Sequence, residues 1–466
     1  MPLDYARAHA DAFERDLADA LRIPSVSADP AHAPDVRRCA DWLAGHLRAA
    51  GFKAAEVRET AGHPLVYAED LSAGPDAPTV LVYGHYDVQP PDPLDLWTSP
   101  PFEPVVRDGK LYARGSADDK GQVFMHVKAA ESFFKTGTPL PVNLKLLIEG
   151  EEEVGSSNLA PYVEAHADEL ACDVIVISDT AMFAPGVPSV TVGLRGLAYV
   201  QVTLTGPDRD LHSGVYGGGV ENPANALCRL IAKLHDDEHR VTIPGFYDAV
   251  RPLTDAERRA WADLPFDEGG WLGEIGLRAG KTEAGYTIFE GTTARPTLDV
   301  NGIGGGYQGA GSKTVLPSKA FAKISCRLVP DQDPHAVAAM LRAWFEQHTP
   351  ATMTLAFEEL HGGQPVLMDT EGPAIRAAAS ALEATYGRAP YFTREGGSIP
   401  VVADLKRLLG VDCVLLGFGL TGDSIHSPDE HFGLDRYHEG IASVIRFLQH
   451  YGAQHDAGTH ALRQAA

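Results

Sequence analysis

The 466-residue sequence has few cysteines, few basic residues and no long apolar run, and each shortage excludes a class of protein. Its five cysteines are scattered and form no CxxC pair, which argues against a disulfide framework and a thiolate zinc site. Only 39 lysines and arginines stand against 63 acidic residues, so the basic surface that nucleic acids and anionic membranes need is missing. No apolar run approaches the roughly 20 residues of a membrane span, and no signal peptide is recognisable. We therefore expect a cytoplasmic protein that binds neither nucleic acid nor membrane.

The first part of the chain alternates between helix and strand patterns. The clearest elements are helices at 35–50 and 122–134 and strands at 79–83, 143–148 and 173–177. The helices are amphipathic, and the strands are short apolar runs bounded by glycine, proline or polar residues. This alternation predicts an α/β domain in which helices cover the faces of a central sheet.

From about residue 195 the pattern changes to strands that have one polar face. Residues 197–204 and 320–328 alternate apolar and polar side chains, as half-exposed strands do. Helices are expected after Asn222-Pro223 and Asp333-Pro334, because proline is favoured at the first helical position. Two strands and two helices of this kind predict a small α+β domain.

The last hundred residues return to helices and a buried strand, with the strand at 411–416 and a final helix at 434–450. We therefore predict a discontinuous core domain, residues 1–193 and 372–466, interrupted by an inserted domain at 194–371. The stretch 236–293 has no clear pattern, and no element is predicted there.

Residues that can bind metal ions or move protons are concentrated after the predicted strands of the core domain. They lie in the segments Gly84-His85-Tyr86-Asp87, Ala117-Asp118-Asp119-Lys120, Glu149-Gly150-Glu151-Glu152-Glu153, Ser178-Asp179-Thr180 and Asp423-Ser424-Ile425-His426. Ligands of open α/β sheets gather outside the carboxyl ends of the strands, so these side chains are expected to converge. Any one segment alone is ordinary; Asp118, for example, could simply cap a helix. Together, two histidines and several carboxylates match the nitrogen and oxygen ligands that Zn²⁺ or Mn²⁺ prefers.

The acidic run Glu149–Glu153 and the pair His85 and Asp87 carry the most chemical information. Four acids within five residues repel one another, and an apolar strand leads straight into them, so a solvated surface run explains them poorly. A cation would neutralise part of this charge and leave one carboxylate free as a base. Asp87 is well placed to accept the second ring N–H of His85, which would fix its tautomer.

The ordered set of motifs resembles the M20 metallopeptidase family over nearly the whole chain. The matching residues are Gly84-His85-x-Asp87, Asp118-Asp119-Lys120-Gly121, Glu152-Glu153-x-Gly155-Ser156, Ser178-Asp179 and His426. The stretches 86–90, 97–104 and 394–400 are most similar to the dipeptidase (carnosinase-like) branch. The fold implied is a metal-binding catalytic domain with a central mixed sheet, plus an inserted α+β (ferredoxin-like) lid and dimerisation domain.

The resemblance implies two divalent metal ions per subunit, Zn²⁺ or Mn²⁺, and names their ligands. These are Asp118, shared by both ions, His85 and Asp179 on one ion, and Glu153 and His426 on the other. The Asp118–Asp119 peptide bond would be cis.

Catalytic and substrate-binding roles are implied in the same way. Glu152 would be the general base, and Asp87 would orient His85. His212, in Asp210-Leu211-His212-Ser213-Gly214, would act in trans by reaching across a homodimer to stabilise the oxyanion. The implied substrate contacts are Arg327 for a carboxylate, Thr314 and His361 as accessory groups, and Glu395 and Ser398 at the other end of the substrate.

These roles predict hydrolysis of the amide bond of dipeptides or similarly small peptides with a free carboxylate. An N-acyl amino acid deacylase or desuccinylase of the same family is the main alternative. A non-catalytic binding protein is disfavoured, because every implied ligand and the base are present. The GxGxxG pattern at 304–309 leads into a strand rather than a helix, and Ser312 stands where a P-loop needs lysine, so nucleotide binding is not expected.

Overall fold

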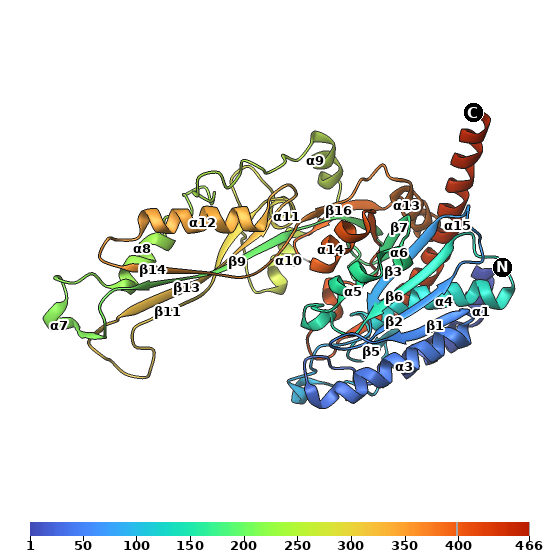
Figure 1. Cartoon of the computed structure of the whole chain (residues 1–466), viewed down its shortest axis with the longest axis horizontal. Helices are drawn as coiled ribbons and strands as arrows, with labels where there is room; N and C mark the ends of the chain where they lie inside the picture. The colour runs from blue at the N-terminus through green and yellow to red at the C-terminus, as the bar shows by residue number, and fades with distance from the viewer. Residues whose placement is uncertain (398, 466) are drawn as a thin grey trace. The chain divides into compact units, whose positions relative to one another are not determined.

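The computed structural model describes residues 1–397 and 399–465, which form two compact units (Figure 1). The first unit contains Met1–Val192, Met368–Thr393 and the chain from Asp404 onward, and the second contains Gly193–Leu367 and Arg394–Ala403. The stretch Arg394–Ala403 groups with the second unit, whereas the predicted core domain included it. Within the described ranges, no helix is both long enough and apolar enough to cross a membrane.

The first unit is built around a mixed sheet. Seven of its strands lie in the order β1 (Ala54–Arg58), β2 (Leu65–Asp70), β6 (Asn143–Glu149), β3 (Thr79–His85), β7 (Val174–Ile177), β17 (Cys413–Leu415) and β8 (Ser189–Leu194). The neighbours β6, β3, β7 and β17 are parallel, and the remaining pairs are antiparallel. Every residue of β6 and β7 is buried, as expected for parallel strands covered on both faces. The predicted α/β class and these buried strands are confirmed.

Helices pack against this sheet and against one another. They are α1 (Pro2–Ala8), α2 (Ala10–Leu21), α3 (Ala33–Ala50), α4 (Lys120–Thr136), α5 (Leu159–Ala165), α6 (Ala167–Leu170), α13 (Pro373–Tyr386) and α15 (Leu434–Ala465). Helix α14 (Pro400–Leu409) begins in the stretch assigned to the second unit and continues into the first. Helix α3 buries residues three or four positions apart, among them Val36, Leu43 and Leu47, and packs on β1 and β2. Helix α4 is buried over most of its surface between β3 and α15, and it ends where Gly137 adopts a left-handed conformation. The site described below lies where α4 begins.

A small three-stranded sheet in the first unit joins two distant parts of the chain. Its order is β18 (His431–Gly433), β5 (Lys110–Tyr112) and β4 (Val105–Arg107), and all pairs are antiparallel. Because β18 pairs with β5, the segment after residue 420 lies beside the loop that follows Tyr112. Both segments carry predicted metal ligands.

The second unit contains a four-stranded antiparallel sheet with two helices. The elements follow in the order β9 (Gly196–Thr205), α8 (Pro223–Ile231), β11 (Thr297–Gly305), β13 (Lys319–Leu328), α12 (Pro334–His348) and β14 (Thr354–Gly363). The strand order β11-β13-β9-β14 and the sequence β-α-β-β-α-β are those of a ferredoxin-like domain. Both predicted helix starts are capped: Asn222 accepts from Ala224 N at 2.9 Å and Asp333 from Ala336 N at 2.8 Å.

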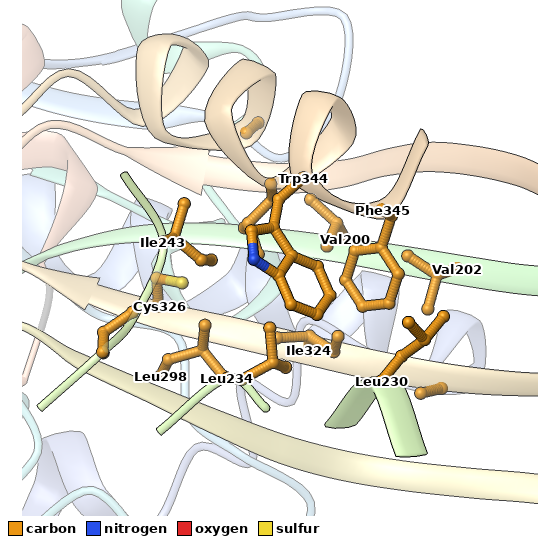
Figure 2. Packing of buried hydrophobic residues seen from close by; sticks show 14 of the residues in the cluster. Val200, Val202, Leu230, Leu234, Ile243, Leu298, Ile324, Cys326, Trp344 and Phe345 are labelled. Atoms are coloured by element: carbon orange, nitrogen blue, oxygen red, sulfur yellow. The ribbon is translucent and has the colours of Figure 1, made fainter. Parts of the chain in front are cut away.

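The core of the second unit lies between the sheet and the helices α8 and α12. Trp344 and Phe345 of α12 pack among Val200, Val202 and Ile324 of the strands (Figure 2). Residues of β13 alternate between buried and accessible positions as the sequence predicts. The stretch without a clear pattern forms the short helices α9 (Asp255–Ala262), α10 (Glu268–Glu274) and α11 (Ile288–Thr293).

Candidate metal centre

The register of the parallel strands brings the first candidate ligands to one edge of the sheet. His85 is the last residue of β3 and lies opposite Glu149, the last residue of β6. Tyr83 lies opposite Ile177, the last residue of β7, so Asp179 follows two residues beyond that strand. The carboxyl ends of three neighbouring strands therefore present His85, the acidic run and Asp179 together, as expected for such sheets.

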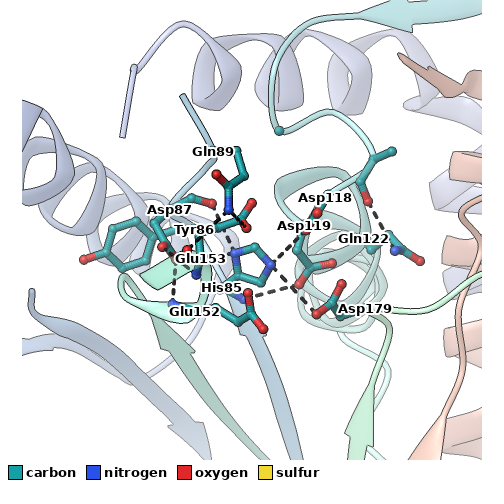
Figure 3. A network of polar contacts seen from close by, with 12 residues as sticks. His85, Tyr86, Asp87, Gln89, Asp118, Asp119, Gln122, Glu152, Glu153 and Asp179 are labelled. Carbon is teal, nitrogen blue, oxygen red and sulfur yellow. Dashed lines mark hydrogen bonds and ion pairs between the residues drawn. The ribbon is translucent and has the colours of Figure 1, made fainter. Parts of the chain in front are cut away.

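The first cluster of potential ligands consists of His85, Asp118 and Asp179. His85 Nε2 lies 3.0 Å from Asp118 Oδ1 and 3.9 Å from Asp179 Oδ2 (Figure 3). One ligand atom from each residue lies within 4.8 Å of the others. This spacing suits three ligands of one cation.

The second cluster consists of Asp118, Glu153 and His426. His426 Nε2 lies 2.9 Å from Asp118 Oδ2 and 3.2 Å from Glu153 Oε2. Glu153 belongs to the 3₁₀ turn Glu152–Val154, and His426 lies in the loop before β18 with a φ of 59°. The two oxygens of Asp118 thus face different histidines, so this residue is common to both clusters.

The charge of this region fits a pair of cations. Although burial alone lowers the pKa of His85, its hydrogen bonds with Asp118 and Asp87 raise that pKa well above the usual value. Hydrogen bonds with Asp118 and Glu153 raise the pKa of His426 to about 10. Burial and the nearby charge of Asp118 raise the pKa of Asp179 well above its usual value. The raised pKa values show that the carboxylates here favour a nearby positive charge, which bound divalent cations would supply. Imidazole and carboxylate groups are ligands that suit Zn²⁺ or Mn²⁺.

Asp87 supports the acidic turn as well as His85. Its backbone carbonyl lies 3.1 Å from His85 Nδ1, and its Oδ1 lies 3.4 Å from the same nitrogen. Its carboxylate accepts from Glu152 N at 3.2 Å and from Glu153 N at 3.1 Å. The sequence suggested only the contact with His85; the geometry adds the two amides, which are the nearer partners of the carboxylate.

Glu152 lies beside both clusters and belongs to neither. Burial and the negative charges of Glu153 and Asp118 raise its pKa to about 7, despite the opposing influence of His85. A buried carboxylate with this pKa can accept and release a proton near neutral pH.

Two further features of the centre are a cis peptide bond and a residue that the sequence did not single out. The Asp118–Asp119 bond is cis, as the resemblance implies, and Asp119 Oδ2 accepts from His85 N at 3.2 Å. Gln89 donates through Nε2 to Glu153 Oε2 at 2.8 Å. Gln89 lies in the stretch 86–90 that resembles the dipeptidase branch, and this resemblance could have pointed to Gln89 as a residue of the site.

A third group of potential ligands in the described chain already contains a cation. It consists of Asp16, His46 and Glu131. The buried ammonium of Lys128 donates to Asp16 at 2.6 Å and to Glu131 at 2.8 Å, and it lies 2.8 Å from His46 Nε2. Lysine therefore supplies the positive charge here, and a metal ion is not required.

The remaining predicted site residues lie in the second unit. His212 and Thr314 lie close together, because β10 (Leu211–His212) pairs with β12 (Val315–Leu316) and Ser213 N donates to Thr314 O at 3.0 Å. Arg327 of β13 lines a cavity of about 1010 Å³ together with Arg195 and Ser325. The predicted carboxylate-binding residue Arg327 therefore lies at the wall of a cavity.

His361, Glu395 and Ser398 complete the predicted substrate contacts. His361 of β14 makes an edge-to-face contact with Tyr199 at a centroid distance of 5.0 Å. Glu395 ends β16 (Tyr391–Glu395) and is half-buried, and its carbonyl accepts from Arg195 N at 3.3 Å. Ser398 lies outside the described residues.

Comparison with known proteins identifies the family to which the chain belongs. The profile of peptidase family M20/M25/M40 matches residues 81–450, which is most of the sequence. The chain belongs to this metallopeptidase family and is a hydrolase.

Within this family, the chain is similar to proteins of the dipeptidase branch. The chain is 34% identical to Cys-Gly metallodipeptidase DUG1 of Candida albicans, over 94% of each sequence. It is 30% identical to human Beta-Ala-His dipeptidase, over 95% of this chain and 91% of that one. Among solved structures, the M20 family metallo-carboxypeptidase Sso-CP2 of Sulfolobus solfataricus superposes with a TM-score of 0.81 at 32% identity, covering 95% of this chain and 99% of that chain.

Proposed function

We propose that the protein hydrolyses the amide bond of dipeptides or similarly small peptides with a free carboxylate, using two divalent ions, Zn²⁺ or Mn²⁺. The observation that carries the proposal is the position of Asp118, whose two oxygens lie 3.0 and 2.9 Å from the Nε2 atoms of His85 and His426. Asp179 would complete the ligand set of one ion, and Glu153 would complete the ligand set of the other. The names of the relatives support dipeptides as the substrate class.

The protein's own groups would divide the proton chemistry between them. Divalent ions bound at such a centre lower the pKa of water towards about 7 and polarise the scissile carbonyl. Glu152 takes a proton from the attacking water and returns it to the leaving amine nitrogen. Asp87 holds the backbone amides of Glu152 and Glu153, so it positions the base and one ligand together.

We assign the second unit to substrate binding and dimerisation, with residues 194–371 as the lid domain and residues 1–193 and 372–466 as the catalytic domain. Arg327 would bind the substrate carboxylate through two parallel hydrogen bonds. His212 would act in the partner subunit of a homodimer. The other proposed substrate contacts are Thr314, His361, Glu395 and Ser398. A cytoplasmic location is also proposed, and the five cysteines, none of which is in a disulfide, support it.

The same centre could serve an N-acyl amino acid deacylase or desuccinylase, so substrate choice needs a direct test. The purified protein is stripped with a chelator, reloaded with Zn²⁺ or Mn²⁺, and analysed for bound metal. It is then assayed with a panel of dipeptides and with N-acetyl and N-succinyl amino acids. We expect about two ions per chain and the highest kcat/KM on dipeptides. Faster turnover of the acyl amino acids would favour the alternative, and no metal-dependent turnover of either class would refute the proposal.

A further inference from the structure

Glu430 is buried beside the metal centre and has no role in the scheme above. Its carboxylate accepts four hydrogen bonds from one short loop. Oε2 accepts from Arg114 Nη1 at 2.6 Å and from Gly115 N at 3.0 Å. Oε1 accepts from Ala117 N at 3.0 Å and from Asp118 N at 3.2 Å. One side chain therefore holds the backbone of the loop that ends at Asp118.

The contact continues the pairing of two strands. In β18 and β5, His431 lies opposite Tyr112, and the next backbone bond runs from Ala113 N to Glu430 O at 3.1 Å. Beyond that point the backbone of the loop no longer has a partner strand, and the carboxylate of Glu430 takes over as acceptor. The loop also needs its glycine: Gly115 has a φ of +85°, and a Cβ there would lie 2.6 Å from Val88 Cγ1.

The segment that carries Glu430 also carries His426, four residues earlier. Between them, Asp429 accepts from Thr98 N at 2.9 Å and from Thr98 Oγ1 at 2.6 Å. On the other side of His426, Asp423 is buried in a two-bond pair with Arg436, with both distances 2.6 Å. The segment is thus held on both sides of His426, and Glu430 ties it to the Asp118 loop.

We propose that Glu430 is a positioning residue that sets the distance between Asp118 and His426 before metal binds. The proposal rests on the proposed function, because it assigns Asp118 and His426 to the same ion. Without this carboxylate, the amides of Gly115, Ala117 and Asp118 lose their acceptor, and the Asp118 side chain is no longer held near His426. Residues that support metal ligands in this way typically change metal affinity by about 10–100-fold when they are replaced.

The first test uses the wild-type protein without metal. Hydrogen exchange of the peptide that contains Gly115, Ala117 and Asp118 is measured in the chelator-stripped protein and again after Zn²⁺ is added. If Glu430 orders the loop, these amides are protected already in the stripped protein, and Zn²⁺ adds little. Amides that exchange freely until Zn²⁺ is added would show that the metal orders the loop, and the proposal would be overturned. This measurement stands even if substitution of Glu430 prevents folding.

The second test compares Glu430→Gln with the matched control Asp429→Asn. Glutamine offers one acceptor oxygen, and its amide group would face two of the four donors. Asparagine at position 429 keeps an acceptor for Thr98 N and can donate to the Thr98 hydroxyl, so this support of the His426 segment survives the substitution. Asp429 does not contact the Asp118 loop, and its φ of 60° is one that asparagine tolerates. Zn²⁺ binding to both stripped variants is measured by calorimetry, and kcat is measured on a dipeptide at rising Zn²⁺ concentration.

We expect about 10–100-fold weaker Zn²⁺ binding in Glu430→Gln, with kcat largely restored at saturating Zn²⁺, and near wild-type affinity in Asp429→Asn. Wild-type affinity in Glu430→Gln, or an equal loss in both variants, would refute the positioning role. Failure of the proposed function looks different: the wild-type protein itself would then bind no metal or leave dipeptides intact, whatever the exchange of the loop amides.

Discussion

Replacement of Glu152 by glutamine should separate metal binding from proton transfer. Glu152 belongs to neither ligand cluster, so the two ions should still bind. Its structural hydrogen bond is made by the backbone N–H, which donates to Asp87 at 3.2 Å and survives the substitution. Glutamine has nearly the same shape but cannot accept a proton from water. The variant should therefore fold and bind metal as the wild type does, and lose turnover.

The size of the loss follows from the proposed role of this carboxylate. General base catalysis contributes roughly 10²–10⁴-fold to a rate, or about 3–5 kcal/mol of barrier. Glu152 would both take the proton from water and return it to the leaving amine, so its contribution should be near the upper part of that range. We expect kcat to fall about 10³-fold or more, while KM changes little.

The matched control is Glu151→Gln, the same change one residue earlier. Glu151 accepts from His63 N and Asn158 Nδ2, both at 2.8 Å, so it holds the turn and faces no ligand cluster. This variant should lose some stability and keep kcat within a few-fold. Metal content is measured by atomic emission, and kcat and KM are measured on one dipeptide, for both variants and the wild type. A Glu152→Gln enzyme that keeps kcat within tenfold of wild type, or one that loses its metal, would refute the assignment of Glu152 as base.

Three further predictions concern other parts of the molecule. Arg327→Ala should raise KM for dipeptides with a free carboxylate at least tenfold more than for their amides, and an equal effect on both would exclude the carboxylate contact. Mixing chains that carry His212→Ala with chains that carry Glu152→Ala should restore part of the activity through mixed dimers, whereas no recovery would argue against a histidine acting in trans. Burial lowers the pKa of His126 to about 3, below the value near 6.5 expected in the unfolded chain. Between these two pKa values only the unfolded chain binds the proton, so the free energy of unfolding falls as the pH falls. When the pH is lowered from 6.5 to 5, the free energy of unfolding measured in urea should fall by about 2 kcal/mol less in His126→Gln than in the wild type. Equal losses in the two proteins would contradict this prediction.

Much of the candidate metal centre could be predicted because its candidate ligands lie next to regular elements. His85 and Asp179 follow strands whose apolar runs are plain in the sequence, and parallel strands end at a common edge. The sheet of the second unit was predictable in part because β9 and β13 alternate between buried and accessible residues. Residues 236–293 were not predictable, because their helices are only six to eight residues long and too short to show a clear periodic pattern.

The surroundings of Glu149 and Glu151 in the acidic run could not be predicted from the sequence, and the roles of Glu152 and Glu153 were implied only by the family resemblance. Glu149 bonds Tyr83 and Ser156, Glu151 bonds His63 and Asn158, Glu152 lies beside the ligands, and Glu153 faces His426. Four similar side chains within five residues thus have four different surroundings. A residue type alone does not say which of them is buried or which faces a cation.

By itself the sequence determined the α/β class, the strand ends and the chemical types of the candidate ligands, because these depend on local periodicity and on neighbouring residues. Only the tertiary structure decided that the two oxygens of Asp118 face His85 and His426, and that Glu430 accepts from a loop more than 300 residues earlier in the chain. Such contacts join segments that are far apart in sequence, and their geometry depends on how the sheets and helices pack rather than on any local pattern.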